Sequence, residues 1–191
     1  MILGVKKTIS KGCGMQLCCT KKVLDYLKVQ PEAVEFVDPL FSWHVNMFIL
    51  CRKKALLLVN DLSRYPILLF GIKKADVRNF NELILNSISM QLTGAGFGQA
   101  RVAEYISRSG NVSILKTHNR AVLSHCSQMA FLAGYEVEDL FFDELLQPVF
   151  SERAASLIYK IETGNGRDYY RPRDLMAEAL SFSHIDTLKS E

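Results

Sequence analysis

Three apolar segments of strand length, separated by short polar turns, constrain the fold of this chain more than any other feature. They run from Trp43 to Cys51, from Ala55 to Asp61 and from Tyr65 to Gly71. The connecting stretches, "RKK" and "DLSR", are turn-sized, so we predict an antiparallel meander of three strands. Pro66 has no backbone N–H to donate, which predicts that the third strand starts there or lies at a sheet edge.

The spacing of apolar residues predicts the elements around this meander. We expect a strand at 15–20, a helix at 21–27 capped by Thr20, a loop at 30–39, a helix from 77 capped by Asp76, a helix at 99–110, a strand at 111–117, a helix at 120–133 capped by Asn119 or Thr117, helical segments over 135–162, a loop at 163–174 and a last helix at 175–182. This order predicts an α+β fold: a mixed sheet of four to five strands, including the meander, with helices mainly on one face.

The length of 191 residues suits one domain that buries its core without disulfides or metal. Residues 1–14 are rich in Lys and Gly and lack a pattern. We expect them to be a disordered extension or to follow a wrongly chosen start codon, with Met15 as the true start. Residues 15–191 then form a single α+β domain.

Composition excludes several classes of partner and site. The net charge of +3 makes nucleic acid an unlikely partner, and apolar runs such as "PILLFGI" are too short to span a membrane. No signal peptide is visible. The five cysteines are odd in number and contain no C-x-x-C pair, which is typical of reduced thiols and predicts a cytoplasmic protein.

No motif for a cofactor or a metal stands out. "GAGFG" at 94–98 lacks the last glycine of the dinucleotide fingerprint and follows a predicted helix. The metal-ligand candidates, which are the cysteines, His44, His118, His125 and His184, do not repeat at ligand spacing. We therefore predict neither a cofactor nor a metal site.

One candidate pair comes from the first hairpin of the meander. A two-residue loop at Arg52-Lys53 places His44 opposite Asp61, whereas a three-residue loop places Asn46 opposite Asn60. The next turn brings Arg64 close to Asp61. A His–Asp pair can be a structural cross-strand contact, a ligand contact, or a general base with its orienting carboxylate. All three alternatives stay open.

A second polar group, "KTHNR", lies where a predicted strand meets a predicted helix. Arg120 in the first helical turn opposes the helix dipole, so it is either simply exposed or part of an anion site with Lys116 and His118. The later stretch "GRDYYRPRD" mixes basic and aromatic residues as single-strand nucleic-acid binders do, although an exposed loop explains it equally.

Four stretches, "MQLCCTKKVLDYLKVQPE", "DPLFSWHVNMF", "RKKALLLVNDLSRYPILLFGIKKADVRNFNELI" and "ILKTHNRAVLSHCSQM", give the chain a family resemblance. Together they resemble a bacterial domain-of-unknown-function family with a "CTKK"-like strand and helix and a Trp-His strand. Some members are associated with plasmid ORF-3-like proteins. The resemblance runs from Met15 to about Leu180 and supports Met15 as the start. It implies a shared organisation and a link to mobile elements, and brings no activity.

Two functions follow from these observations. The first is a non-enzymatic cytoplasmic binding or regulatory module for a protein partner or a small ligand, because no catalytic motif is present. The alternative is an enzyme for a small anionic or nucleotide-like substrate. There His44 is the base and Asp61 its orienter, and Arg64, Lys116 or Arg120 binds the anion.

Overall fold

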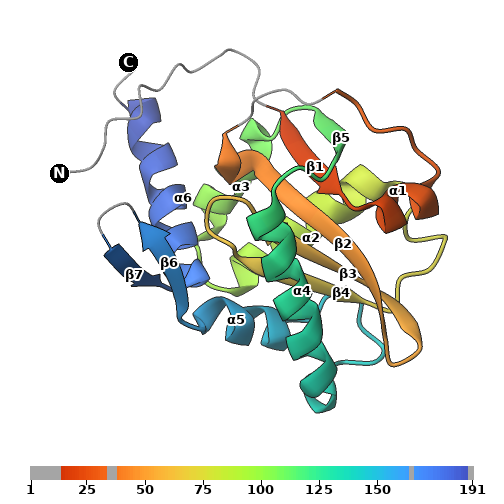
Figure 1. The fold of residues 1–191 in the computed structure, drawn as a ribbon. Helices are drawn as coiled ribbons and strands as arrows, with labels where there is room; N and C mark the ends of the chain where they lie inside the picture. Colours follow the sequence, from red (N-terminus) through yellow and green to blue (C-terminus); the bar gives the residue numbers. More distant parts are fainter. Residues whose placement is uncertain (1–13, 34–37, 164–165, 189–191) are drawn as a thin grey trace.

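The computed structural model describes residues 14–33, 38–163 and 166–188, and gives side-chain surroundings outside 161–168 and 182–188. Its elements in chain order are β1 (Met15–Cys19), α1 (Lys21–Leu27), β2 (Ser42–Leu50), β3 (Lys53–Asn60), β4 (Pro66–Phe70), α2 (Phe80–Gly94), α3 (Gln99–Arg108), β5 (Val112–Lys116), α4 (Arg120–Tyr135), α5 (Pro148–Ser156), β6 (Tyr159–Thr163), β7 (Gly166–Tyr170) and α6 (Pro172–Leu188). Strands β1 to β5 form one mixed sheet in the order β4-β3-β2-β1-β5, which confirms the predicted α+β class (Figure 1).

The predicted meander is present as β2, β3 and β4, with β4 at the sheet edge and starting at Pro66. The β2–β3 turn consists of Cys51 and Arg52, whose φ angles are 47° and 63°. Positive φ at both positions is the geometry of a type I′ hairpin, which matches the twist of the strands. The turn lies one residue earlier than either register considered from the sequence, so His44 pairs with Val59.

Strands β1 and β5 extend the meander in parallel: β1 pairs with β2 on one side and with β5 on the other. Helix α1 is the crossover from β1 to β2 and buries Val23 and Leu24. Thr20 occupies the position before α1, but its side chain makes no capping bond. Asn119 does cap α4, because its side chain accepts from the N–H groups of Ala121 and Val122.

Two apolar cores lie on opposite faces of the sheet. The first core contains Trp43 and Val45 together with residues of α1, α2, α3 and α6. The second core contains Leu57 and Val59 together with residues of α4 and α5. In Figure 1, α4 crosses in front of the sheet while α2 and α3 lie behind it. Most helices therefore cover one face, and α4 with part of α5 covers the other.

Trp43 is a packing residue of the first core. It is fully buried, and its Nε1 donates to the hydroxyl of Tyr105 at 2.8 Å. The Tyr105 hydroxyl donates in turn to the carbonyl of Leu40 at 2.7 Å. These two hydrogen bonds satisfy the polar atoms of both aromatic side chains, so neither side chain is available for chemistry.

Three expectations about helices are wrong. Helix α2 starts at Phe80 after Asn79, because the Asp76 carboxylate accepts from the N–H of Lys73 and closes a turn before the helix. The helical prediction over 135–162 holds for Tyr135 at the end of α4, for a 3-10 turn at Val137–Asp139 and for α5, and fails elsewhere. The loop predicted at 163–174 contains β7, which pairs with β6, and the start of α6.

The extension predicted at 1–14 lies almost wholly outside the described residues, which begin at Gly14. Over the described part of the chain, no helix combines the length and apolar character needed to cross a membrane.

Candidate functional site

The candidate site lies on the sheet face opposite Trp43, where β1 stands between its two parallel neighbours. Cys18 pairs with His44 of β2 and with Leu115 of β5. Because paired residues point to the same side of a sheet, Cys18 and His44 share a face. The preceding pair, Leu17 and Trp43, faces the first core.

The connections after β1 and β5 leave the sheet on opposite faces. Helix α1 follows β1 and packs into the first core, whereas α4 follows β5 and packs into the second. In open sheets with helices on both faces, ligands bind outside the carboxyl ends of strands at such a switch point. Cys18 is the penultimate residue of β1, and His118 lies two residues beyond β5, so both stand at this position.

Cys18, His44 and His118 form a compact group, which we name the Cys/His cluster. One potential ligand atom from each residue lies within 4.8 Å of the others. The Cys18 Sγ is 3.7 Å from the His118 Nδ1, and the centroids of the two imidazole rings are 5.5 Å apart. Cys18 and His44 are buried, whereas His118 is exposed. The cluster thus has one side toward solvent.

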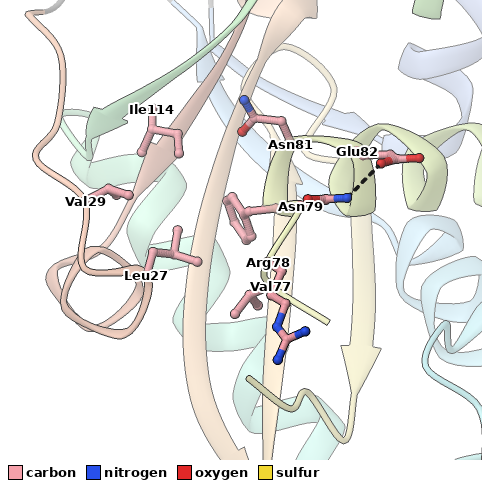
Figure 2. Close-up of a pocket in the computed structure, with 9 residues that line it drawn as sticks. Leu27, Val29, Val77, Arg78, Asn79, Asn81, Glu82 and Ile114 are labelled. Carbon is pink, nitrogen blue, oxygen red and sulfur yellow. Dashed lines mark hydrogen bonds between the residues drawn. The ribbon is translucent and has the colours of Figure 1, made fainter. Parts of the chain in front are cut away.

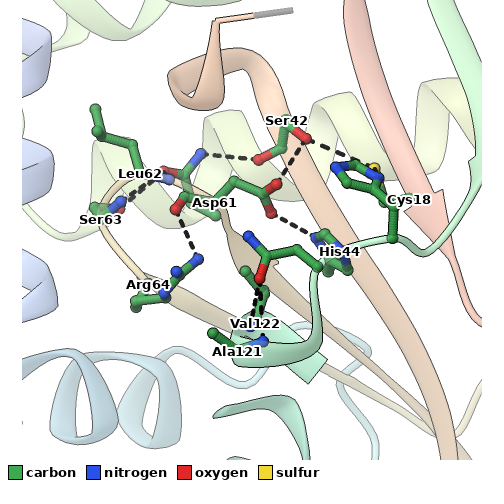
Figure 3. A network of polar contacts seen from close by, with 12 residues as sticks. Cys18, Ser42, His44, Asp61, Leu62, Ser63, Arg64, Ala121 and Val122 are labelled. Atoms are coloured by element: carbon green, nitrogen blue, oxygen red, sulfur yellow. Dashed lines mark hydrogen bonds and ion pairs between the residues drawn. The ribbon is translucent and has the colours of Figure 1, made fainter. Parts of the chain in front are cut away.

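Asp61 holds His44 in a single orientation. Its Oδ1 is 2.5 Å from the His44 Nδ1, and its Oδ2 accepts from the Ser42 hydroxyl at 3.1 Å (Figure 3). The carboxylate therefore fixes the ring proton on Nδ1, which leaves the lone pair on Nε2. The His44 Nε2 is buried and has no hydrogen-bond partner among the residues that the structure describes.

The turn after β3 explains how Asp61 reaches this place. The Asn60 side-chain oxygen accepts from the N–H groups of Leu62 and Ser63, which closes the turn. The Asp61 N–H donates to the Ser42 carbonyl at 2.9 Å, so the carboxylate lies beside the start of β2. His44 pairs directly with Val59, and Asp61 lies two residues farther along the chain, in the diagonal position. The His44–Asp61 contact therefore forms although the observed register is not one of those inferred from the sequence.

The environment of Cys18 keeps its sulfur protonated when no cation is present. Burial raises the pKa of the Cys18 thiol to about 11, and the nearby Asp61 charge acts in the same direction. A contact with the Ser42 hydroxyl opposes this rise and does not overcome it. The thiolate that nucleophilic chemistry requires is therefore disfavoured.

The cluster fits a transition-metal ion better than it fits a nucleophile. Tetrahedral zinc bonds of about 2.0–2.3 Å place a sulfur and a nitrogen ligand about 3.6 Å apart, and the Cys18 Sγ to His118 Nδ1 distance is 3.7 Å. A metal-bound histidine usually donates its other N–H to a carboxylate, as His44 does to Asp61. Cysteine and histidine are the ligands that Zn²⁺ prefers.

The remaining residues expected at a site are distributed differently. Arg64 donates from Nη1 to the backbone carbonyl of Asp61 at 2.7 Å. Lys116 pairs with Cys19, so it points to the face opposite His44 and cannot join an anion site there. Arg120 is exposed at the first position of α4.

Sequence reasoning missed Cys18 and Ser42 as members of the site and predicted no metal. Spacing along the chain could not reveal the cluster, because its three residues come from β1, β2 and the segment after β5. The sequence did contain one signal for Cys18. Adjacent residues of a strand point to opposite faces, so only one of Cys18 and Cys19 can lie in the first core, and the other thiol lies on the face of the candidate site.

Two other regions, a cavity beside α1 and the stretch "GRDYYRPRD", do not present a comparable group of cysteine and histidine ligands among the described residues. A cavity of about 430 Å³ lies between α1, the start of α2 and β5, and the side chains around it include Leu27, Val77 and Ile114 (Figure 2). In the stretch proposed to grip nucleic acid, Arg173 donates to the Glu152 carboxylate and to the Ala95 carbonyl. Arg173 is therefore occupied within the fold.

Comparison with known proteins adds a family and no activity. Neither curated proteins nor solved structures provide a match. The family described as a domain of unknown function, DUF6933, matches residues 16–175, which is most of the chain. This agrees with the resemblance to a domain-of-unknown-function family. The chain therefore belongs to the DUF6933 family.

Proposed function

We propose that this domain is a binding module that holds one transition-metal ion, Zn²⁺ by its ligand chemistry, through Cys18, His44 and His118. The observation that carries the proposal is the His44 side chain. Its Nδ1 is held by Asp61, while its buried Nε2 has no hydrogen-bond partner among the described residues, and the His44 side chain stands in a group with a thiol and a second imidazole. A buried polar atom without a partner is costly, and a metal ion would satisfy it.

Charge supports a cation at this position. The thiolate of Cys18 and the carboxylate of Asp61 would repel each other in a buried site, which is one reason why the pKa of Cys18 is raised. A divalent ion would stabilise both anions and lower that pKa. Binding is therefore expected to release the Cys18 proton.

The compartment follows from the same cysteine. A thiolate ligand requires a reduced thiol, and Cys18, Cys19 and Cys126 are free and buried. We propose a cytoplasmic location on this basis. The bacterial origin and the link to plasmid proteins that the resemblance implies stay predictions.

A second candidate is the metal-free enzyme in which His44 is a general base and Asp61 its orienter. The 2.5 Å contact between them favours it. The burial of His44 weakens it, since a substrate must reach the Nε2 that accepts the proton. The two candidates differ in whether the protein without a metal ion is active: the enzyme would be, and the metal-binding module would not.

The test is zinc binding by the intact chain and two cysteine variants. Cys18 and Cys19 are adjacent, both buried, and on opposite faces, so Cys18→Ala and Cys19→Ala are matched. After chelation, competition with a chromophoric chelator should give one Zn²⁺ per chain for the native protein and for Cys19→Ala. We expect Cys18→Ala to bind about a hundredfold more weakly, because it removes a ligand. Failure of the native protein to bind Zn²⁺, or equal binding by Cys18→Ala, contradicts the proposal.

A further inference from the structure

We infer that the metal in the Cys/His cluster keeps one coordination position for a small anion from solvent, which enters beside His118. The inference rests on the proposed function, since it concerns the same ion. It adds the class of ligand that the site takes and the side from which that ligand arrives.

The number of protein ligands leaves one coordination position of the metal open. Zinc is almost always four-coordinate in structural sites, whereas sites that exchange a ligand have three protein donors. In the described part of the chain, the Cys/His cluster supplies three donors. Two further polar side chains that contact the cluster, Ser42 and Asp61, already make hydrogen bonds. Ser42 donates its proton to Asp61, and both oxygens of Asp61 accept, one from Ser42 and one from His44.

The three ligands differ in their exposure to solvent. Cys18 and His44 are both completely buried, and they close the inner side of the site. His118 is exposed and lies in the short segment between β5 and α4. A ligand from solvent must therefore approach along the His118 side, past the first turn of α4.

The charge at the open position favours an anion. A divalent ion with one thiolate and two neutral imidazoles carries a net charge of about +1. The Asp61 carboxylate offsets this charge from behind the His44 ring, farther from the ion than a fourth ligand would be, so the open position still favours an anionic ligand over a cationic one. Arg120 is exposed, lies two residues after His118 and has no ion pair among the described residues. A cation in the first turn opposes the helix dipole, so an arginine two residues after the exposed ligand is explained if it attracts anions.

The experiment uses Co²⁺ as a spectroscopic substitute for Zn²⁺ and sodium azide as the probe anion. The full chain is loaded with one equivalent of Co²⁺, and its visible bands are followed as azide replaces chloride at constant ionic strength. We expect a saturable change in the visible bands, while the thiolate-to-cobalt absorption persists because Cys18 stays bound. Bands that do not respond to azide in protein carrying one Co²⁺ would overturn the inference and leave the proposed function intact.

The entrance is tested with two arginine variants. Arg120→Gln should weaken azide binding several-fold, while Arg52→Gln, an exposed arginine in the β2–β3 turn, should bind azide like the native protein. Equal azide affinity in all three proteins would overturn the role of Arg120 and the proposed direction of entry. Failure to take up Co²⁺ at all would overturn the proposed function itself, so the two failures are distinguishable.

Discussion

His44 and His125 are two buried histidines on the same side of the sheet, and they differ in what surrounds them. Each has a buried Nε2 that makes no hydrogen bond within the described part of the chain. His44 stands beside the Asp61 carboxylate, the Cys18 thiol and a second imidazole. His125 stands against the ring of Tyr159, with centroids 4.6 Å apart, and forms a hydrogen bond with the backbone of Arg64.

The charges around the two rings are opposite in sign. Burial is the main reason why the pKa of His125 is lowered to about 4; the positive charge of Arg64 acts in the same direction, and the hydrogen bond with the Arg64 backbone opposes it. A site that disfavours a proton on a ring also disfavours a metal ion next to it. Two buried imidazoles with free lone pairs are thus not equivalent, because the sign of the neighbouring charge decides which one can bind a cation.

The strongest test of this comparison replaces each histidine by glutamine. His44→Gln should weaken zinc binding by about a hundredfold or more, because it removes a ligand whose orientation is already fixed. His125→Gln should change the zinc affinity less than about twofold, because it removes no ligand. Competition with a chromophoric chelator measures both, and circular dichroism confirms that each variant is folded. Equal losses in the two variants would mean that replacing either buried histidine weakens zinc binding, whatever the sign of the charge beside it.

The second test removes the charge of Asp61 and keeps its shape. Asp61→Asn should weaken zinc binding about 10- to 100-fold, as is typical when a carboxylate partner of a metal-bound histidine is lost. Asp25→Asn is the control, since Asp25 is an exposed carboxylate that pairs with Lys21 on α1. Zinc affinity of Asp61→Asn within about twofold of the native value would show that Asp61 does not support a ligand.

The meander and the flanking helices could be predicted because local patterns determine them. Short polar turns between apolar runs fix β2, β3 and β4, and Pro66 marks the edge strand. The β6–β7 hairpin was missed because its residues lie in a charged stretch that was interpreted as a helix followed by a loop. The sequence "TGNG" between two short runs with tyrosines is a hairpin signal that could have identified it.

The candidate site could be predicted only in part. The proximity of His44 and Asp61 follows from two strands joined by a tight turn, and it tolerates the shift in register because Asp61 reaches diagonally. Cys18 and His118 are 100 residues apart and meet only because β1 and β5 are parallel neighbours. Parallel pairing between distant strands is set by the tertiary fold, so no local pattern carries it.

The third test uses pH to examine His125 alone. Its pKa in the folded state is about 4, below the value near 6.5 in an unfolded chain, so the unfolded chain binds the proton first as the pH falls. The stabilising contribution is present above pH 6.5 and is lost between about 6.5 and 4. Between about pH 7.5 and 5.5 the native protein should lose about 1 kcal/mol more free energy of unfolding than His125→Gln does.

Urea denaturation at the two pH values, with a chelator present to remove metal, gives this difference. His44 and His118 are unchanged in both proteins, so their titration cancels in the comparison. If the two proteins lose the same free energy of unfolding, His125 is not held neutral by burial and Arg64. The contrast with His44 would then have no electrostatic basis.

The smallest effect is expected from Ser42→Ala, which tests how far the support of His44 extends. The Ser42 hydroxyl donates to the Asp61 Oδ2 at 3.1 Å and lies 3.6 Å from the Cys18 Sγ. One hydrogen bond contributes about 1 kcal/mol, so its loss should weaken zinc binding roughly fivefold. Ser63→Ala is a matched control, because Ser63 is equally buried and bonds to Asn60 without touching Asp61. A loss as large as that in Asp61→Asn would place Ser42 among the groups that bind the metal. No loss would mean that the backbone bond from Asp61 to Ser42 already positions the carboxylate.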